Sequence, residues 1–278
     1  MAQAAKYDPP SYWGNLVGQK FDLRGVAYPD LSLAFHEYLY RAMADSVERG
    51  LDRWGMGPEQ LRDAQVLDVG SGVGFWIDFW LARGARSISG IDLTQASAER
   101  LAERFPQLSF SRGDIADPRP EWDGRFDVIS AMSIVHHIPS QERWQAAVVN
   151  LGRMLKPGGR LLLMDPILTH PWWGKEIEAS DNGRARSLDE HRAALAQTGT
   201  AVEFVLPTSV LLSNPMDAST PARFRVAQAW WSAMHRIARR PGLMRAAGPP
   251  IYAADRWLSR RGMMPSSKIL FCRRAAAA

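Results

Sequence analysis

The sequence predicts an α/β protein in which a mostly parallel sheet is covered by helices on both faces. From about residue 65 onward, short runs rich in Val, Ile and Leu alternate with helical patterns. A glycine-rich loop at 70–74 directly follows the first of these runs, and a last apolar run at 268–272 stands close to the end of the chain. Alternation of this kind builds βαβ units, which place their strands in parallel.

Turn and capping signals bound the elements of this region. The turn at 156–159 introduces one strand, and Ser187 with Glu190 forms a capping box that opens a helix. The expected strands are 65–69, 87–91, 108–111, 126–131, 160–164, 201–206 (with a continuation toward 212) and 268–272. The expected helices between them are 74–83, 96–104, 141–155 and 187–199.

The two ends of the chain have a different organisation. Residues 1–30 are rich in Pro, Gly and aromatic residues and are expected to be irregular, whereas 32–49 should form a helix that stops at Gly50. An amphipathic helix is expected over 222–240 and a shorter one over 251–261. We therefore divide the chain into an N-terminal helical and aromatic cap (1–60), a core (61–212 with 265–274) and a basic helical insertion (213–264).

Composition excludes several classes of protein. Of the 278 residues, 46% are hydrophobic and 23% are charged, which is typical of globular proteins. The single cysteine, Cys272, excludes a disulfide framework and a four-thiolate zinc site. No uninterrupted apolar stretch reaches the length of about 18 residues that suggests a membrane-spanning helix. The first residues also lack the pattern of a secretory signal, so we expect a cytoplasmic protein.

The positive charge is concentrated in one segment. Residues 222–262 hold nine arginines and one acid, Asp255, so this segment carries +8 while the whole chain carries only +5. Nucleic-acid-binding proteins more often spread basic charge over a whole face, so no nucleic-acid partner is expected. The segment is expected to be a lid over a substrate. Two alternatives stay open: a peripheral contact with an anionic membrane, and a packing helix with a solvated arginine face.

The glycine-rich loop is the strongest local signal for ligand binding. Gly70, Gly72 and Gly74 let the backbone approach a ligand closely, and the following helix offers free amide donors. A dinucleotide fingerprint requires G-x-G-x-x-G, but here the third glycine comes one residue early and Phe75 follows it. Asp68, at the end of the first strand, would suit a cationic or amine-bearing ligand.

Two more acids follow the next two strands. Asp92 stands 18 residues after Gly74, where a carboxylate can accept hydrogen bonds from both hydroxyls of a ribose. Asp114 is suited to receive the amine of an adenine. The alternatives are a helix N-cap for Asp92 and an Asx turn for Asp114. Because the carboxyl ends of parallel strands share one edge of the sheet, the three acids predict one ligand crevice.

Three further motifs complete a recognisable set, namely Phe126-Asp127-Val128-Ile129, His136-His137-Ile138-Pro139 and Leu155-Lys156-Pro157-Gly158-Gly159. The combination resembles the class I S-adenosylmethionine (SAM) dependent methyltransferases over residues 64–206 and 268–272. The resemblance implies a Rossmann-like, seven-stranded sheet whose last strand is antiparallel. It also implies SAM as the methyl donor and S-adenosylhomocysteine (SAH) as the product.

The resemblance assigns roles to individual residues. The amino-acid end of SAM would lie against Asp68, Gly70, Ser71, Gly72 and Gly74, the ribose against Asp92 and Leu93, the adenine against Asp114 and Ile115, and the sulfonium beside Met132. Residues 130–133 lack the Pro-Pro-aromatic run of enzymes that methylate exocyclic amines of DNA bases. Asp165 is the only obvious metal-binding acid near this strand and the next, so no metal is expected.

Two adjacent histidines follow the fourth strand. His136 and His137 would lie at the mouth of the expected pocket, where one of them could act as a general base toward a hydroxyl acceptor. The alternatives are that they position the substrate or that they only pack. A carboxylate acceptor would need no base.

The acceptor site is expected to come from segments outside the minimal core, since loops at the carboxyl end of a rigid sheet usually carry specificity. The candidate substrate-binding residues are Trp13, Tyr28, His170, Trp172, Trp173 and Trp231. Their aromatic character favours a large apolar or planar acceptor, and nearby arginines would suit a carboxylate or phosphate on it.

The sequence therefore predicts a SAM-dependent methyltransferase, acting on oxygen of a small or medium-sized metabolite in natural-product tailoring. The alternatives are N- or C-methylation of a metabolite, lipid or peptide, an RNA-modifying enzyme, and a non-catalytic SAM- or SAH-binding regulatory module. The expected partner is the small-molecule acceptor, and the protein is expected to be a monomer or a homodimer.

Overall fold

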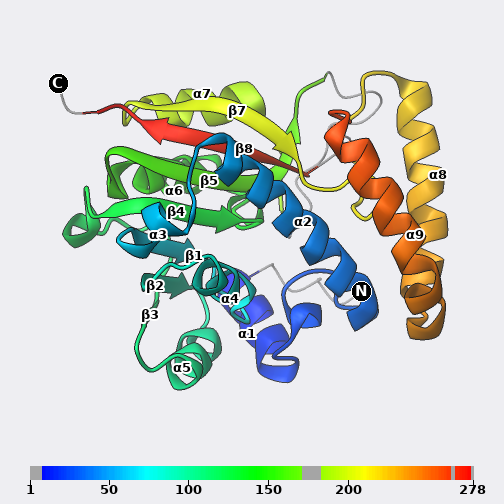
Figure 1. Cartoon of the computed structure of the whole chain (residues 1–278), viewed down its shortest axis with the longest axis horizontal. Helices are drawn as coiled ribbons and strands as arrows, with labels where there is room; N and C mark the ends of the chain where they lie inside the picture. The colour runs from blue at the N-terminus through cyan, green and yellow to red at the C-terminus, as the bar shows by residue number, and fades with distance from the viewer. Residues whose placement is uncertain (1–7, 171–182, 264–266, 277–278) are drawn as a thin grey trace, which may run out of the picture.

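One central sheet organises the molecule (Figure 1). The structure is a computed structural model, and it describes residues 8–170, 183–263 and 267–276. The strands follow the order β3-β2-β1-β4-β5-β8-β7, and the short β6 pairs with β5 beside this path. Their bounds are β1 (Gln65–Val69), β2 (Ser87–Asp92), β3 (Ser109–Arg112), β4 (Phe126–Met132), β5 (Leu155–Leu168), β6 (Arg186–Ser187), β7 (Thr200–Pro207) and β8 (Ser267–Arg274).

All the strand pairs are parallel except those of β8, which runs antiparallel to both β5 and β7. The predicted Rossmann-like sheet with an antiparallel last strand is confirmed. Two strand ends differ from the prediction. β5 begins already at Leu155, which pairs with Phe126, and the turn residues 156–159 form an irregularity before Arg160 pairs with Val128. β7 ends at Pro207 without continuing toward 212.

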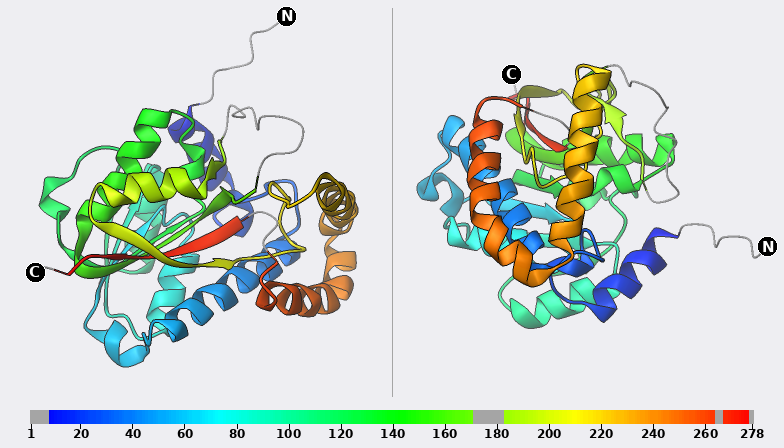
Figure 2. Two further views of the ribbon diagram at one scale, coloured as in Figure 1. Left: turned by 90° about the horizontal axis from the view of Figure 1, so that it is seen from above. Right: turned by 90° about the vertical axis from the view of Figure 1, so that its right-hand side faces the viewer.

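Helices cover both faces of the sheet (Figure 2). Their bounds are α1 (Pro9–Gln19), α2 (Leu33–Arg53), α3 (Pro58–Arg62), α4 (Phe75–Ala82), α5 (Gln95–Arg104), α6 (Gln141–Met154), α7 (Leu188–Ala196), α8 (Pro221–Ala238) and α9 (Pro241–Arg260), with 3-10 turns η1 (Leu23–Gly25), η2 (Pro120–Trp122) and η3 (Val135–His137). Buried side chains of α2, α4 and α5 form the core on one face, and those of α6 and α7 form it on the other.

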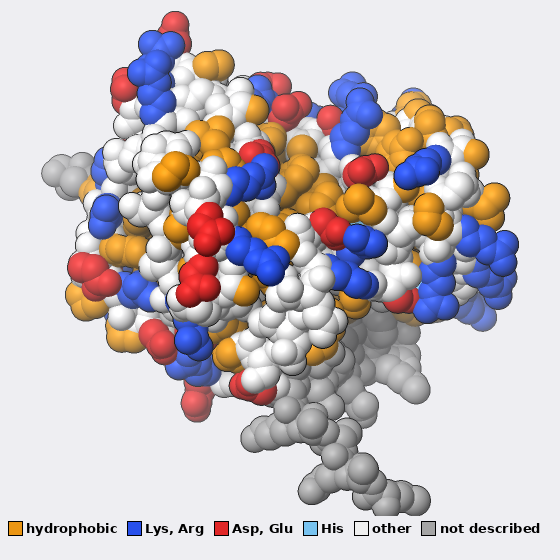
Figure 3. All heavy atoms as spheres, turned by 90° about the horizontal axis from the view of Figure 1, so that it is seen from below, with side chains coloured by type: hydrophobic (Ala, Val, Ile, Leu, Met, Phe, Trp, Pro, Cys, Tyr) orange, Lys and Arg blue, Asp and Glu red, His pale blue; other side chains and the backbone are white. Residues whose placement is uncertain are grey.

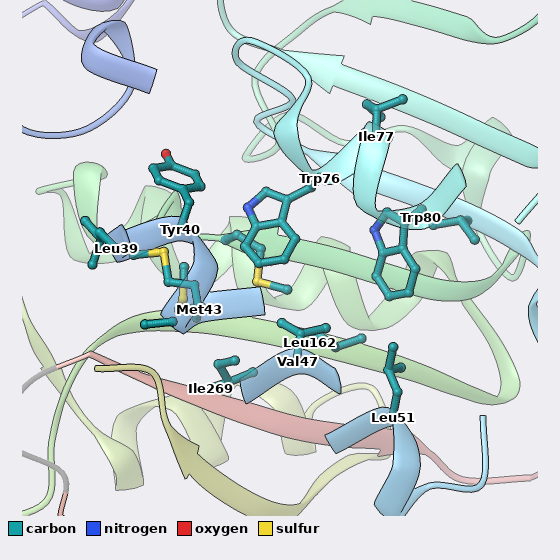
Figure 4. Close-up of a cluster of buried hydrophobic side chains, with 14 of the residues drawn as sticks. Leu39, Tyr40, Met43, Val47, Leu51, Trp76, Ile77, Trp80, Leu162 and Ile269 are labelled. Carbon is teal, nitrogen blue, oxygen red and sulfur yellow. The ribbon is translucent and has the colours of Figure 1, made fainter. Parts of the chain in front are cut away.

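The core beside α2 contains two buried tryptophans of α4 (Figure 4). Trp76 and Trp80 lie against apolar side chains of α2 and of the sheet, among them Val47 and Leu162. The indole Nε1 of Trp80 donates a 3.0 Å hydrogen bond to Ser130 Oγ on β4. Burying an indole is favourable only when its N–H finds an acceptor, so this bond fixes α4 against the sheet at a defined position.

The helix expected to stop at Gly50 continues to Arg53, which corrects that prediction. A Cβ atom at Gly50 would lie 1.9 Å from the ring of Phe271 on β8. The glycine is therefore required by the close approach of α2 to the sheet, rather than as a helix terminator.

Two further expectations about the ends of the chain are wrong. Residues 1–30 are not irregular throughout, because α1 begins there at Pro9, with the side chain of Asp8 accepting a hydrogen bond from the amide of Ser11. The short helix expected over 251–261 begins at Pro241, so α9 includes Pro249 and Pro250 in its interior. Among the described residues, no helix combines the length and the hydropathy needed to cross a membrane.

Candidate functional site

A cavity of about 340 Å³ opens at the carboxyl ends of β1, β2, β3 and β4. The chain leaves β1 toward β2 on one side and returns at β4 on the other, so this edge is where an open α/β sheet binds ligands. Of the residues predicted to bind the cofactor, those that line the cavity are Gly70, Ser71, Gly72, Asp92, Leu93, Asp114, Ile115 and Met132. Asp68 and Gly74 lie outside this lining.

The glycine-rich loop has a backbone that other residues would adopt only with strain. Gly70 has φ +71° and Gly72 has φ +53°. A Cβ atom at Gly70 would come within 2.1 Å of the side chain of Ile134, which also lines the cavity. The loop thus lies in close contact with the segment after β4, and its backbone borders the space that a ligand would occupy.

Gly74 has a different role. It precedes the first residue of α4 with φ +88°, and a Cβ atom there would lie 2.7 Å from Leu101 of α5. The glycine permits α4 to start close to α5, which brings the start of α4 to the cavity.

Asp68 is buried beneath the glycine-rich loop. Its Oδ1 accepts a 2.7 Å hydrogen bond from Ser130 Oγ, the hydroxyl that also accepts from Trp80. Its Oδ2 has no hydrogen-bond partner among the described residues. Burial raises the pKa of Asp68 to about 7. A buried carboxylate oxygen without a donor is costly, so this position favours a cationic group nearby.

Asp92 is held rigidly at the edge of the cavity. Its Oδ2 accepts from the amide of Gly72, and its Oδ1 accepts from the amide and the hydroxyl of Thr94, all at 2.8 Å. Burial raises the pKa of Asp92, while these hydrogen bonds act in the opposite direction. An ionised carboxylate has about four lone-pair sites, so Asp92 retains acceptor capacity toward a ligand.

Asp114 is anchored by a residue that sequence analysis missed. Arg143 of α6 donates to Asp114 Oδ2 at 2.7 Å and to Asp117 at 3.0 Å, and the amide of Ala116 donates to Asp114 Oδ1 at 2.8 Å. Arg143 lines the cavity as well. No sequence pattern indicated that Arg143 would form ion pairs with two acids that precede its helix by more than 20 residues.

The two histidines occupy different surroundings. His137 lines the cavity, while His136 forms a 2.9 Å hydrogen bond through Nδ1 with Oδ1 of the buried Asp165 on β5. Their rings lie 3.9 Å apart. Burial would raise the pKa of Asp165, but the attraction and hydrogen bonding of His136 and His191 together outweigh it and hold that pKa below its usual value. His191 of α7 approaches the other oxygen of Asp165 at 3.9 Å.

The predicted acceptor residues are spread over several places. Trp13 of α1 lines the cavity, and its ring lies 4.7 Å from that of His137. Tyr28 and Trp231 pack against each other at 5.3 Å, outside the cavity lining. His170 is exposed and hydrogen-bonds Asp217. Trp172 and Trp173 lie outside the described residues.

Helix α1 contributes more of the cavity wall than the sequence predicted. Pro9, Pro10 and Val17 line it together with Trp13. The sequence does carry a helix-start signal here, since Asp8 is a good N-cap and proline is favoured in the first helical turn. Within the described ranges, no three His, Cys, Asp or Glu side chains are grouped as they would be around a metal ion.

Comparison with known proteins agrees with this geometry. Residues 66–159 match the family model of a methyltransferase domain. The chain is 31% identical over 163 residues to a 27-O-demethylrifamycin SV methyltransferase of Amycolatopsis mediterranei, covering 54% of this chain and 58% of that protein. It is 33% identical over 107 residues to a ubiquinone biosynthesis O-methyltransferase of Xanthomonas oryzae, covering 37% of this chain and 43% of that protein.

The chain thus spans about half the length of the curated relatives that it matches. Among solved structures, the [4+2]-cyclase SpnF aligns with a TM-score of 0.54 and 19% identity, covering 84% of this chain and 81% of that chain. At this identity the likeness shows the fold alone.

Proposed function

We propose that this chain, which belongs to the class I SAM-dependent methyltransferases, transfers a methyl group to an oxygen atom of a small or medium-sized metabolite. The observation that carries the proposal is the His136–Asp165 pair, which lies beside His137, and His137 lines the cavity. The names of the two relatives, which both specify an oxygen acceptor, support the choice of oxygen. Natural-product tailoring remains the type of pathway that we propose.

The residues that line the cavity, together with Asp68 beneath the glycine-rich loop, fit SAM. Asp68, with its unpartnered and buried Oδ2, would favour the cationic amino-acid end of the cofactor at the glycine-rich loop. Asp92 would accept from the ribose hydroxyls, and Asp114 from the adenine amine. When bound, SAM supplies an electrophilic methyl group.

His136 is proposed as the general base. Because Asp165 Oδ1 accepts the proton on Nδ1, the ring is held in the tautomer whose Nε2 is free to accept a proton. Methylation of a hydroxyl oxygen requires that oxygen to lose its proton, and His136 Nε2 would take it. The His136 side chain is 18% exposed, and its ring lies against that of His137, which lines the cavity.

His137 and Trp13 are proposed to position the acceptor. Their rings contact each other edge to face, and both line the cavity, so they would form an aromatic wall for a planar or apolar molecule. Closing such a wall excludes water, which would otherwise compete for hydrogen bonds at the acceptor oxygen.

The reaction is tested with SAM that carries a ¹³C-labelled methyl group. The protein is incubated with this SAM and a small-molecule extract, and the products are examined by NMR, in which O-, N- and C-bound methyl carbons resonate in separate regions. We expect label in the O-methyl region. Label only at nitrogen or carbon would refute the choice of oxygen.

A non-catalytic SAM-binding module is the second candidate. It is kept because the fold by itself does not specify methyl transfer. Binding of SAH without label transfer from any extract fraction would favour this second function.

A further inference from the structure

The outer faces of α8 and α9 form a surface that the proposed reaction does not use. Both helices lie at one end of the molecule, where they face away from the sheet (Figures 1 and 2). We call this the α8–α9 surface, and it comprises the exposed side chains of residues 222–263. Seen from below, basic and hydrophobic side chains lie side by side at this end (Figure 3).

The exposed face of α9 is a continuous apolar stripe. Leu243, Ala246, Pro250, Ala253 and Trp257 recur at intervals of three and four residues, and all are exposed. Leu243 is 48% exposed and Trp257 is 54% exposed. The inward face, with Met244, Gly248, Tyr252, Asp255 and Ser259, is buried. The inward face of α9 is therefore buried against the rest of the protein, whereas the outward apolar stripe is left uncovered by the described residues.

Free arginines border this stripe. Arg239 and Arg256 form ion pairs with Asp30 and Asp45. The exposed arginines of this surface that have no ion pair within the described part of the chain are Arg223, Arg225, Arg236, Arg240, Arg245, Arg260 and Arg261. The single acid of the segment, Asp255, is buried and accepts hydrogen bonds from Ser209, Val210 and Leu211, and it forms no ion pair with these arginines.

Trp257 carries a basic group directly on its ring. The guanidinium of Arg261 lies 3.9 Å from the ring centroid, and Met263, just beyond the helix, is 49% exposed. Val226 of α8 is 71% exposed and adds a second apolar residue beside arginines. Exposed Trp, Leu and Met next to arginine are the composition of an amphipathic helix that lies in a membrane interface.

We propose that the α8–α9 surface docks the protein on an anionic phospholipid bilayer, with Leu243 and Trp257 inserted at the level of the headgroups and the free arginines on the lipid phosphates. A second copy of the chain is a poor occupant, because two faces of the same strong positive charge repel each other. A nucleic acid would leave the apolar stripe in water. The docking does not depend on the proposed reaction.

The arginine contribution is tested by flotation with vesicles of phosphatidylcholine, with or without phosphatidylglycerol. Each basic residue near such a surface contributes about 1 kcal/mol, or roughly a fivefold change in affinity. We therefore expect Arg236→Gln/Arg240→Gln to lower the partition onto phosphatidylglycerol vesicles by roughly 25-fold. The control is Arg62→Gln/Arg86→Gln, which removes two exposed arginines outside the α8–α9 surface and should leave the partition unchanged.

The apolar contribution is tested by Leu243→Ser/Trp257→Ser. We expect this variant to lose vesicle binding while its thermal midpoint stays at that of the wild type, because both side chains are exposed. Flotation that needs no phosphatidylglycerol, an equal loss in the Arg62/Arg86 control, or no flotation at all would overturn the proposal. Tighter binding to RNA than to vesicles, undiminished in the serine variant, would overturn it in favour of a nucleic acid.

Discussion

Replacing Asp68 with asparagine should stabilise the ligand-free protein at high pH. Asparagine keeps an oxygen that accepts from Ser130, but it removes the carboxyl group whose pKa burial raises from 3.8 to about 7. One pKa unit corresponds to about 1.4 kcal/mol, so the full penalty is at most about 4 kcal/mol.

The sign follows from which state ionises first. The unfolded chain loses the Asp68 proton near pH 3.8 and the folded protein only near pH 7. The penalty on folding therefore grows through this window and is complete above it. At about pH 5 only roughly 2 kcal/mol of it is present, so the advantage of the variant should grow by about 2–3 kcal/mol between about pH 5 and pH 8.

Urea unfolding without ligand, at both pH values, measures this difference. Asp123→Asn, at an exposed position, is the matched control and should show no such change. An advantage of Asp68→Asn that is the same at both pH values would refute the reasoning. The same variant should bind SAH more weakly, because the cationic end of the ligand loses its partner.

Three other substitutions test separate parts of the structure. Asp92→Ala should weaken SAH binding by about 1.5–3 kcal/mol, the scale of hydrogen bonds to a charged group, and unchanged affinity in calorimetry would remove Asp92 from the site. Once an acceptor is known, His136→Ala should lower kcat by a factor of about 10²–10⁴ while the affinity for SAH is retained. Asp165→Asn should lower kcat less and alter the pH profile of kcat. A loss below about tenfold for His136→Ala would exclude His136 as the base. Gly50→Ala should cost at least about 1–3 kcal/mol in urea unfolding, because the added methyl meets a phenylalanine ring on β8, whereas Gly242→Ala has open space and should cost nothing; equal stability of the two would contradict the packing.

The sheet and the cofactor edge were predictable because their signals are local. Each strand is a short apolar run, and the residues that line the cavity at its carboxyl end follow it directly in the chain. Gly70, Asp92 and Asp114 could therefore be placed at one edge from strand order alone. The hydrogen bond between His136 and Asp165 could not be predicted from the sequence, because the two residues come from different elements. Their pairing depends on how β5 lies beside η3.

The ends of the chain were predicted less well, because the prolines and glycines there are compatible with either the end or the interior of a helix. The helix expected over 251–261 begins ten residues earlier, at Pro241, and includes Pro249 and Pro250 in its interior. Gly50 suggested a helix end, yet it serves close packing. A glycine can mark a helix end or a close contact between elements, and a proline can mark a helix end or lie inside a helix. Only the tertiary structure distinguishes these cases.

The central claim is that the cavity at the ends of β1 to β4 binds SAM, and thermal unfolding with SAH tests it most directly. At a hundredfold excess over its dissociation constant, a ligand adds about 2.7 kcal/mol of stability, which should raise the midpoint by several degrees. We predict this rise with SAH, no rise with NAD, and a much smaller one with SAH in Asp92→Ala. No rise with SAH, or a rise with NAD instead, would contradict the account.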